Sequence, residues 1–270
     1  MTIKLGPLGV LMKMSGRSAL VTGATGSLGR IFSETLAELG FDLLLVDRDE
    51  LALNDLGEGL RRSWGINVDL FVCDLEDSDA RLTLIETIKG RTSLDVLVNN
   101  AAFVGDANLE GWATPFEQQS LDTWRRALEV NLTAPFSLAQ GLTPLLNCSP
   151  GASIINIGSI YGFLGPDWRL YEGTSMSNPA AYASSKGGLI QLTRWLSTTL
   201  GPKIRVNCIS PGGIARGQAV KFTDRYTVRT PLGRMATEDD FRGAIAYLAS
   251  DLSRYVTGQN LCVDGGWSVW

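Results

Sequence analysis

The sequence predicts a single α/β domain built on a doubly wound parallel sheet of about seven strands. Short apolar runs alternate with helical patterns from Ser18 to Val263. Glycine or polar residues follow most of these runs, as ligand-binding residues do at the carboxyl ends of parallel strands. No linker, repeat or low-complexity tract divides the 270 residues, so we expect one domain.

Each predicted strand is a short apolar run, typical of a parallel strand that is buried on both faces. The predicted strands cover residues 18–21, 43–46, 68–72, 94–98, 153–157, 205–209 and 260–263. The helices between them carry apolar residues at helical spacing. We expect Ser78 or Asp79 to cap the helix that reaches Lys89, Ser120 to open a long helix, and Thr237 to cap the last one.

Composition excludes several function classes. The net charge is −4, from 24 basic and 28 acidic residues without a basic block, so nucleic acid is not an expected partner. No apolar run is long enough to cross a bilayer, and the N-terminus lacks the features of a signal peptide, so we expect a cytoplasmic protein without a membrane partner.

The histidine and cysteine content restricts the chemistry. The chain has no histidine, which excludes histidine general bases and Ser-His-Asp triads. Its four cysteines form no CxxC pair, so no metal site is expected. Cys73, Cys208 and Cys262 lie in strand-like runs and are expected to be buried. Acid–base chemistry must therefore use Tyr, Lys, Asp, Glu or Cys.

A glycine-rich turn joins the first strand to the first helix of the predicted sheet. A turn with little side chain approaches a diphosphate closely, and the following helix N-terminus favours negative charge. The alternative is a plain strand-to-helix turn. We predict that the turn binds a dinucleotide through Gly23, Thr25, Gly26, Ser27, Leu28 and Gly29.

Acidic and amide residues end the next strands of this Rossmann-type pattern. Asp47 lies 18 positions after Gly29, where an acid binds the adenosine ribose and favours NAD over NADP. Arg48 beside it offers a site for a 2′-phosphate, which leaves NADP as the less favoured alternative. Asp74 is predicted either to bind the adenine amine or to cap the next helix. Asn99 and its small neighbours are predicted to line a ligand crevice, the alternative being a polar turn.

A Tyr and a Lys four residues apart form the candidate reactive centre. Tyr182 and Lys186 lie on one face of a predicted helix, where the ammonium group is expected to lower the pKa of the phenol. A tyrosine tuned in this way suits general acid–base work near neutral pH. The pattern alone is also compatible with an ordinary amphipathic helix.

Taken together, the motifs resemble the short-chain dehydrogenase/reductase family, in its compact single-domain form. The resemblance extends from Ser18 to Gly266 and includes the glycine turn, Asp74, Asn-Asn-Ala at 99–101, Asn131, Ser159, YASSK at 182–186, Pro211-Gly212 and TGQNLCVDGG from Thr257. It implies an N-terminal extension (residues 1–16) before a dinucleotide-binding catalytic domain (17–270). It further implies a homodimer or homotetramer.

The same resemblance assigns roles to individual residues. Tyr182 exchanges a proton with the substrate oxygen, Ser159 donates a hydrogen bond to that oxygen, and Lys186 supports the tyrosine and binds the nicotinamide ribose. Asn131 supports a proton-relay water. Further cofactor contacts are implied for Leu75, Ala101, Pro211, Gly212 and Ile214.

The chain departs from the family pattern in three places. Ser27 replaces the middle glycine of the usual motif, and Arg216 stands near the place of a cofactor-contacting threonine. An additional segment, about 163–179, separates Ser159 from Tyr182 and is expected to lie beside the substrate; a substrate loop is expected at about 214–235. The candidate substrate residues are Tyr161, Trp168, Arg169 and Tyr171.

These departures leave several functions open. We favour an NAD-dependent oxidoreductase that interconverts a secondary alcohol and a ketone, with a carbohydrate-like compound as the favoured substrate. The alternatives are a 3-oxoacyl or small-carbonyl reductase and a non-catalytic dinucleotide-binding protein; an epimerase or dehydratase is disfavoured because no substrate domain follows the sheet. The additional segment is equally compatible with a subunit contact or a surface elaboration.

Overall fold

The computed structural model describes residues 7–105 and 109–270 and contains one seven-stranded parallel sheet. The strand order is β3-β2-β1-β4-β5-β6-β7. The strands are β1 Ser18–Thr22, β2 Asp42–Asp47, β3 Val68–Val72, β4 Val96–Asn99, β5 Ala152–Ile157, β6 Ile204–Pro211 and β7 Asn260–Val263. The predicted doubly wound α/β class is confirmed.

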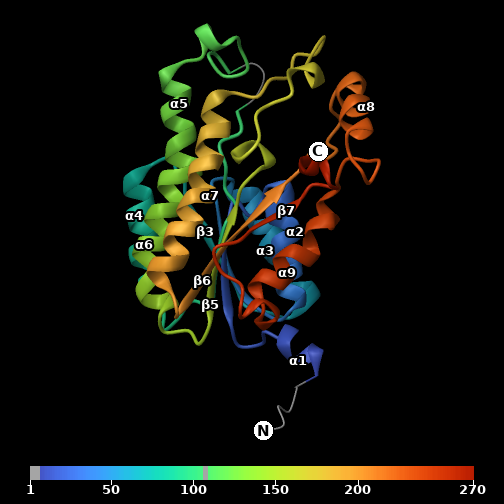
Figure 1. The fold of residues 1–270 in the computed structure, drawn as a ribbon. Helices are drawn as coiled ribbons and strands as arrows, with labels where there is room; N and C mark the ends of the chain where they lie inside the picture. The colour runs from blue at the N-terminus through green and yellow to red at the C-terminus, as the bar shows by residue number, and fades with distance from the viewer. Residues whose placement is uncertain (1–6, 106–108) are drawn as a thin grey trace.

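Helices cover both faces of the sheet, as Figure 1 shows. One face carries α2 (Ser27–Glu38), α3 (Glu50–Trp64) and α9 (Arg242–Ala249). The other carries α4 (Ser78–Lys89), α5 (Leu121–Leu128), α6 (Ala134–Leu146) and α7 (Ala180–Leu200). The helix α8 (Val220–Val228) lies beyond the carboxyl ends of the strands, next to the chain's C-terminus.

Two apolar cores hold these layers together. Phe32 and Leu36 of α2 are fully buried against Phe241 and Ile245 at α9. Leu138 and Leu142 of α6 belong to the core on the opposite face. The central strands contribute to both cores because successive side chains point to opposite faces, which explains their continuous apolar runs.

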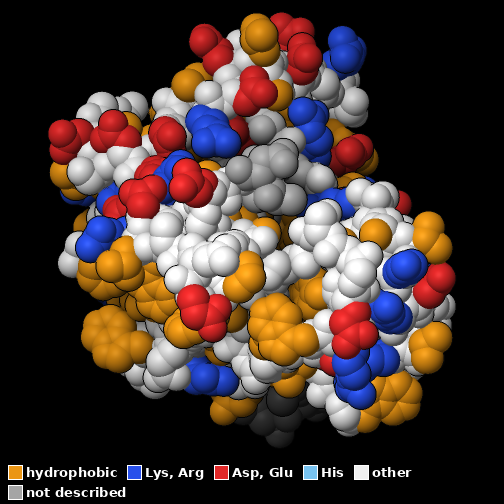
Figure 2. Space-filling model, turned by 90° about the horizontal axis from the view of Figure 1, so that it is seen from above, with side chains coloured by type: hydrophobic (Ala, Val, Ile, Leu, Met, Phe, Trp, Pro, Cys, Tyr) orange, Lys and Arg blue, Asp and Glu red, His pale blue; other side chains and the backbone are white. Residues whose placement is uncertain are grey.

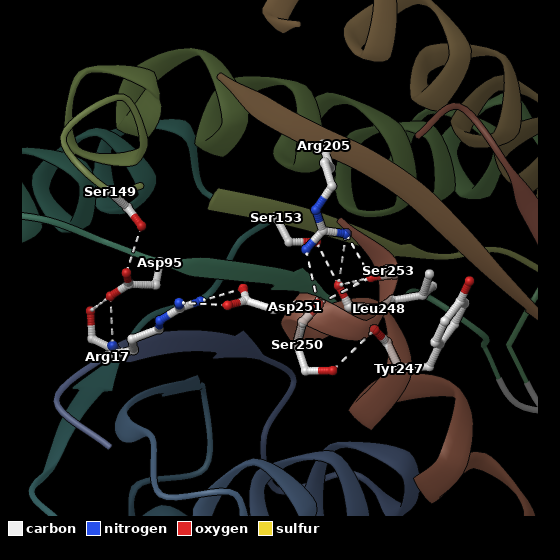
Figure 3. A network of polar contacts seen from close by, with 11 residues as sticks. Arg17, Asp95, Ser149, Ser153, Arg205, Tyr247, Leu248, Ser250, Asp251 and Ser253 are labelled. Atoms are coloured by element: carbon white, nitrogen blue, oxygen red, sulfur yellow. Dashed lines mark hydrogen bonds and ion pairs between the residues drawn. The ribbon is translucent and has the colours of Figure 1, made fainter. Parts of the chain in front are cut away.

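A polar network closes the amino end of the sheet (Figure 3). Arg205, at the start of β6, is 9% exposed and donates to the Leu248 carbonyl at 3.2 Å and to Ser253 Oγ at 2.8 Å. Asp95 accepts from Ser18 N at 2.8 Å and from Ser149 Oγ at 2.5 Å. These hydrogen bonds satisfy charged and polar groups away from the carboxyl ends, so we assign them to the scaffold.

The helix caps are partly as predicted. Ser120 caps α5 by accepting from Thr123 N at 3.1 Å, and Thr237 forms a capping box. The cap of α4 is Asp77, which accepts from Asp79 N and Ala80 N. The predictions of Ser78, Asp79 and Asp74 for this role are wrong, because the helix begins at Ser78 and Asp77 is the last extended residue before it.

The ends of the chain hold two further findings. The short helix α1 (Leu8–Met12) precedes Met14, which is 1% exposed and donates its N–H to the Leu39 carbonyl. The end of the predicted extension is thus part of the core, while residues 1–6 of it lie outside the described residues. Cys262 is exposed on the edge strand β7, so the expectation of burial is wrong there. Among the described helices, none is long and apolar enough to cross a membrane.

Candidate active site

A cavity of about 880 Å³ opens at the carboxyl ends of the strands, the end from which Figure 2 views the molecule. It brings together most of the residues predicted from sequence. The predicted residues that line it are Gly23, Thr25, Gly26, Ser27, Leu28, Asp47, Arg48, Asp74, Leu75, Ala101, Ser159, Tyr182, Lys186, Pro211, Gly212 and Ile214. Loops after β1 to β6 thus converge on one space.

The glycine turn after β1 is shaped by close backbone contacts. Gly23 has a φ of +62°, and a Cβ there would lie 2.7 Å from Ala101 Cα. A Cβ on Gly29 would lie 2.0 Å from the Gly23 carbonyl oxygen, so Gly29 packs the helix against the turn rather than lining the cavity. Among the residues that the structure describes, no side chain caps the N-terminus of α2. Its free N–H groups, with exposed Ser27 in the first turn, suit the diphosphate of a dinucleotide.

The acids after β2 and β3 are ordered by backbone donors. Asp47 accepts from Thr25 N at 2.9 Å and from Arg48 N at 2.8 Å. The Arg48 side chain is exposed. Asp74 accepts from Glu76 N at 3.0 Å. Asp47 therefore links the glycine turn to the end of β2, where its carboxylate still has lone pairs for a ribose hydroxyl.

Ser159, Tyr182 and Lys186 come from two neighbouring elements. Ser159 follows β5 in extended conformation and is buried. Tyr182 and Lys186 lie in the first two turns of α7, and Lys186 Nζ is 5.9 Å from the Tyr182 ring centroid. Lys186 is 2% exposed and donates to the Ile157 carbonyl at 2.7 Å. The carboxyl end of β5 therefore fixes the ammonium group beside the phenol.

The electrostatics of this group differ from the expectation in one respect. Burial raises the pKa of Tyr182, while the hydrogen bond with Ser159 and the charge of Arg216 oppose that rise. Burial also lowers the pKa of Lys186 from 10.5 to about 8. The expected lowering of the Tyr182 pKa by Lys186 is wrong for this structure, because desolvation outweighs the opposing contributions.

Besides Gly29, Asn131 and Asn99 also lie beside the cavity rather than on it. Asn131 is fully buried in the π-helical turn Glu129–Thr133 between α5 and α6. Its amide group exchanges hydrogen bonds with the backbone of Phe103 and donates to Ser185 Oγ at 2.9 Å. Asn99 is also buried and donates to Asn156 Oδ1 at 2.8 Å, so its side chain does not line the cavity.

The four candidate substrate residues fall into three different settings. The hydroxyls of Tyr161 and Tyr171 are 2.6 Å apart. Burial is the main cause that raises the pKa of both phenols, and the nearby Tyr182 contributes to the rise. Trp168 lies against Tyr171 and lines a second cavity of about 700 Å³. Arg169 is paired with Asp167 on the surface. None of the four lines the larger cavity.

The additional segment packs on α8 and the C-terminus. Tyr171 contacts Phe222, which stacks on Tyr226, and Tyr226 stacks on Trp267. The Tyr226 hydroxyl accepts from Gly213 N at 2.6 Å. This aromatic ladder thereby links the segment to the Pro-Gly turn that lines the cavity.

Sequence reasoning missed several cavity residues. Asn100 donates to the carbonyls of Thr22 and Gly23, both at 2.9 Å, and so holds the glycine turn. Arg126 lines the cavity and pairs with Glu76 at 2.7 and 3.1 Å. The sequence offered a signal for Asn100, because this residue neighbours the predicted Asn99. It offered no signal for Arg126, because the pairing of Arg126 with Glu76 joins segments that are distant in the chain.

Known proteins share this architecture. The model of the enoyl-(acyl carrier protein) reductase family matches residues 23–268. A 3-oxoacyl-[acyl-carrier-protein] reductase of Thermotoga maritima is 31% identical over 94% of this chain and 99% of its own length. A 2-dehydro-3-deoxy-D-gluconate 5-dehydrogenase of Pseudoalteromonas atlantica is 32% identical over 94% of this chain and 96% of its own.

A solved structure agrees with these relatives. The putative NAD(P)-dependent gluconate 5-dehydrogenase of Beutenbergia cavernae, with NADP bound at low occupancy, has a TM-score of 0.85 and 31% identity. The similarity covers 96% of this chain and 100% of that chain. The predicted family is confirmed by matches that span almost the whole chain. The chain therefore belongs to the short-chain dehydrogenase/reductase family of NAD(P)-dependent oxidoreductases, which act on alcohol and carbonyl groups.

Proposed function

We propose that this protein interconverts a secondary alcohol and a ketone with Tyr182 as the general acid and base. The observation that carries the proposal is the placement of Ser159, Tyr182 and Lys186 around one end of a cavity whose other end has the features of a dinucleotide site. Bound there, a nicotinamide dinucleotide supplies the hydride chemistry.

The three residues have separate tasks in this mechanism. Ser159 orients the substrate oxygen by hydrogen bonding, and Tyr182 donates the proton during reduction or accepts it during oxidation. Lys186 is held by the Ile157 carbonyl beside the Tyr182 ring, where it would bind the nicotinamide ribose. Asn131 anchors the segment after β4 through Phe103, so we assign it a positioning role.

We further propose that the cofactor is NAD(H). The Asp47 carboxylate lies in the cavity at the end of β2, where an acid binds the ribose hydroxyls and repels a 2′-phosphate. NADP(H) is the second candidate, favoured by the exposed Arg48 side chain and by the NADP in the Beutenbergia structure. Thr25, Gly26, Ser27 and Leu28 would hold the diphosphate, and Asp74 and Leu75 the adenine.

The substrate class we favour is carbohydrate-like. Two relatives are named as dehydrogenases of sugar acids. The Tyr161–Tyr171 hydroxyl pair lies near Tyr182, since the Tyr182 phenol contributes to the raised pKa of both. An acyl or small-carbonyl reductase is the alternative, favoured by the Thermotoga relative. Cytoplasmic location and a homodimer or homotetramer remain predictions, the latter testable by sedimentation.

The test of this proposal separates binding from chemistry. Tyr182→Phe removes only the hydroxyl, so it should retain NADH binding and lower turnover about 100-fold or more on any ketone that the wild type reduces. Tyr255→Phe is the matched control, because Tyr255 is fully exposed at 101%. Unchanged turnover in Tyr182→Phe, or no binding of either cofactor to the wild type, would overturn the proposal.

A further inference from the structure

Arg216 carries a cationic side chain that lines the cavity. The proposed mechanism assigns no role to this side chain. In the described part of the chain, the cations that line the cavity are Arg48, Arg126, Lys186 and Arg216. Arg126 is engaged by Glu76 through two hydrogen bonds, and Lys186 by a backbone carbonyl. Arg48 follows β2, at the adenosine end of the predicted cofactor. Arg216 follows β6 and is the remaining cation near the reacting groups.

The guanidinium of Arg216 is held through its Nε atom by one hydrogen bond. Its Nε donates to Glu238 Oε1 at 3.0 Å, and its terminal amino groups make no hydrogen bond within residues 7–105 and 109–270. The side chain is 46% exposed. An arginine fixed through Nε presents its two outer amino groups as a fork, the geometry that binds a carboxylate or phosphate in bidentate fashion.

The backbone that carries Arg216 is also fixed. Gln218 accepts from Arg216 N at 2.7 Å and donates to the Ile214 carbonyl at 2.6 Å. The bridge between Ile214 and Ala236 ties the same segment to the chain before η5 (Glu238–Phe241). The fork is therefore preorganised and needs little ordering when a ligand binds.

The sheet order places this fork at the reacting end of the cavity. Ser159 follows β5, and Arg216 follows the neighbouring β6. Within residues 7–105 and 109–270, the carboxylates that line the cavity lie at the end of β2 or follow β2 and β3, at the far side of the sheet: Asp47, Asp49, Asp74 and Glu76. The charge of Arg216 acts on Tyr182, which is consistent with this placement. The glycine turn, where the diphosphate is expected, follows β1, and two strands separate β1 from β6.

We propose that Arg216 binds an oxyanion group of the substrate, a carboxylate or a phosphate ester, beside the carbon that reacts. The proposal rests on the proposed oxidoreductase function and adds the acidic character of the substrate. Arg216 is thus a specificity-determining residue: it selects acidic substrates and orients them toward Tyr182 and Ser159.

The test uses the full-length protein saturated with NADH and three probes of one carbon skeleton: D-gluconate, D-glucitol and D-glucitol 6-phosphate. Binding is measured by calorimetry. The wild type should bind at least one acidic probe more tightly than glucitol, and the tighter acid identifies a carboxylate or a phosphate as the group. Arg216→Gln should weaken that acid about 10- to 100-fold and leave glucitol unchanged, since charged hydrogen bonds are lost.

Two further variants complete the design. Arg216→Lys keeps the charge without the fork and should fall between the wild type and Arg216→Gln. Arg62→Gln, an exposed arginine on α3, is the matched control and should behave as the wild type.

The contradicting outcomes are distinct. Equal wild-type affinity for the acids and glucitol, or no binding of any probe, would overturn the Arg216 proposal while NADH binding leaves the proposed function intact. A loss of NADH affinity in Arg216→Gln as large as the loss of acid affinity would also overturn it, because Arg216 would then bind the cofactor diphosphate. Failure of the wild type to bind NADH would instead contradict the proposed function.

Discussion

Replacing the buried lysine of the site, Lys186→Met, should change stability in a way that depends on pH. Lys186 is 2% exposed, and burial lowers its pKa from 10.5 to about 8. Below pH 8 both the folded and the unfolded chain carry the proton, so the folded state bears the full cost of burying the charge. That cost corresponds to about 3 kcal/mol, from a gap of about 2.5 pH units at 1.36 kcal/mol each.

The sign of the pH dependence follows from proton binding. Between pH 8 and 10.5 the unfolded chain binds more protons at this site than the folded protein does, so stability rises with pH until the cost has disappeared. The methionine variant lacks this dependence. It also lacks the hydrogen bond to the Ile157 carbonyl, which costs about 1–3 kcal/mol.

These magnitudes predict that the difference in stability between Lys186→Met and the wild type changes sign with pH. At pH 7 the variant should be as stable as the wild type or up to about 2 kcal/mol more stable, although inactive; near pH 10.5 it should be about 1–3 kcal/mol less stable. Urea unfolding at fixed protein concentration measures this difference. Exposed Lys203→Met is the matched control. A difference between wild type and Lys186→Met that stays constant within about 1 kcal/mol from pH 7 to 10.5 would refute the reasoning.

Three further changes have defined expected results. Tyr226→Phe keeps the aromatic ladder but leaves Gly213 N without its acceptor, so urea unfolding should show a loss of about 1–3 kcal/mol, with cofactor affinity lowered as well. Arg205→Met removes the donors to the Leu248 carbonyl and Ser253 and should destabilise the protein by about 1–3 kcal/mol without changing cofactor affinity. Asp47→Ser should shift the ratio of NADH to NADPH dissociation constants toward NADPH; an unchanged ratio would remove Asp47 as the discriminating group.

The sequence was sufficient for the architecture and for most of the site. Continuous apolar runs indicate buried parallel strands, and residues at the carboxyl ends of such strands must lie at one edge of the sheet. Gly23, Asp47, Ser159 and Tyr182 could therefore be placed in one crevice although they are far apart in the chain.

The sequence could not decide which of two neighbouring residues has a given role. Successive residues of a strand point to opposite faces, so the sequence alone could not decide whether Asn99 or Asn100 lines the cavity. A difference of one residue in the start of α4 likewise moved its cap from Ser78 to Asp77.

Long-range contacts were also beyond sequence reasoning. The aromatic residues of the additional segment are candidate substrate residues, and the sequence did not reveal that Trp168 contacts Tyr171 or that Tyr171 contacts Phe222 of α8. The pKa of Tyr182 is likewise set by burial, which only the folded chain defines. Pairing and desolvation of this kind depend on tertiary structure, not on spacing.

The most direct test of the account is a crystal structure of this protein grown with NADH. We predict the diphosphate at the glycine turn and the α2 N-terminus, the adenosine ribose at Asp47, and the nicotinamide beside Tyr182 and Lys186. A dinucleotide bound outside this cavity, or bound in it with the nicotinamide away from Tyr182, would contradict the central claim.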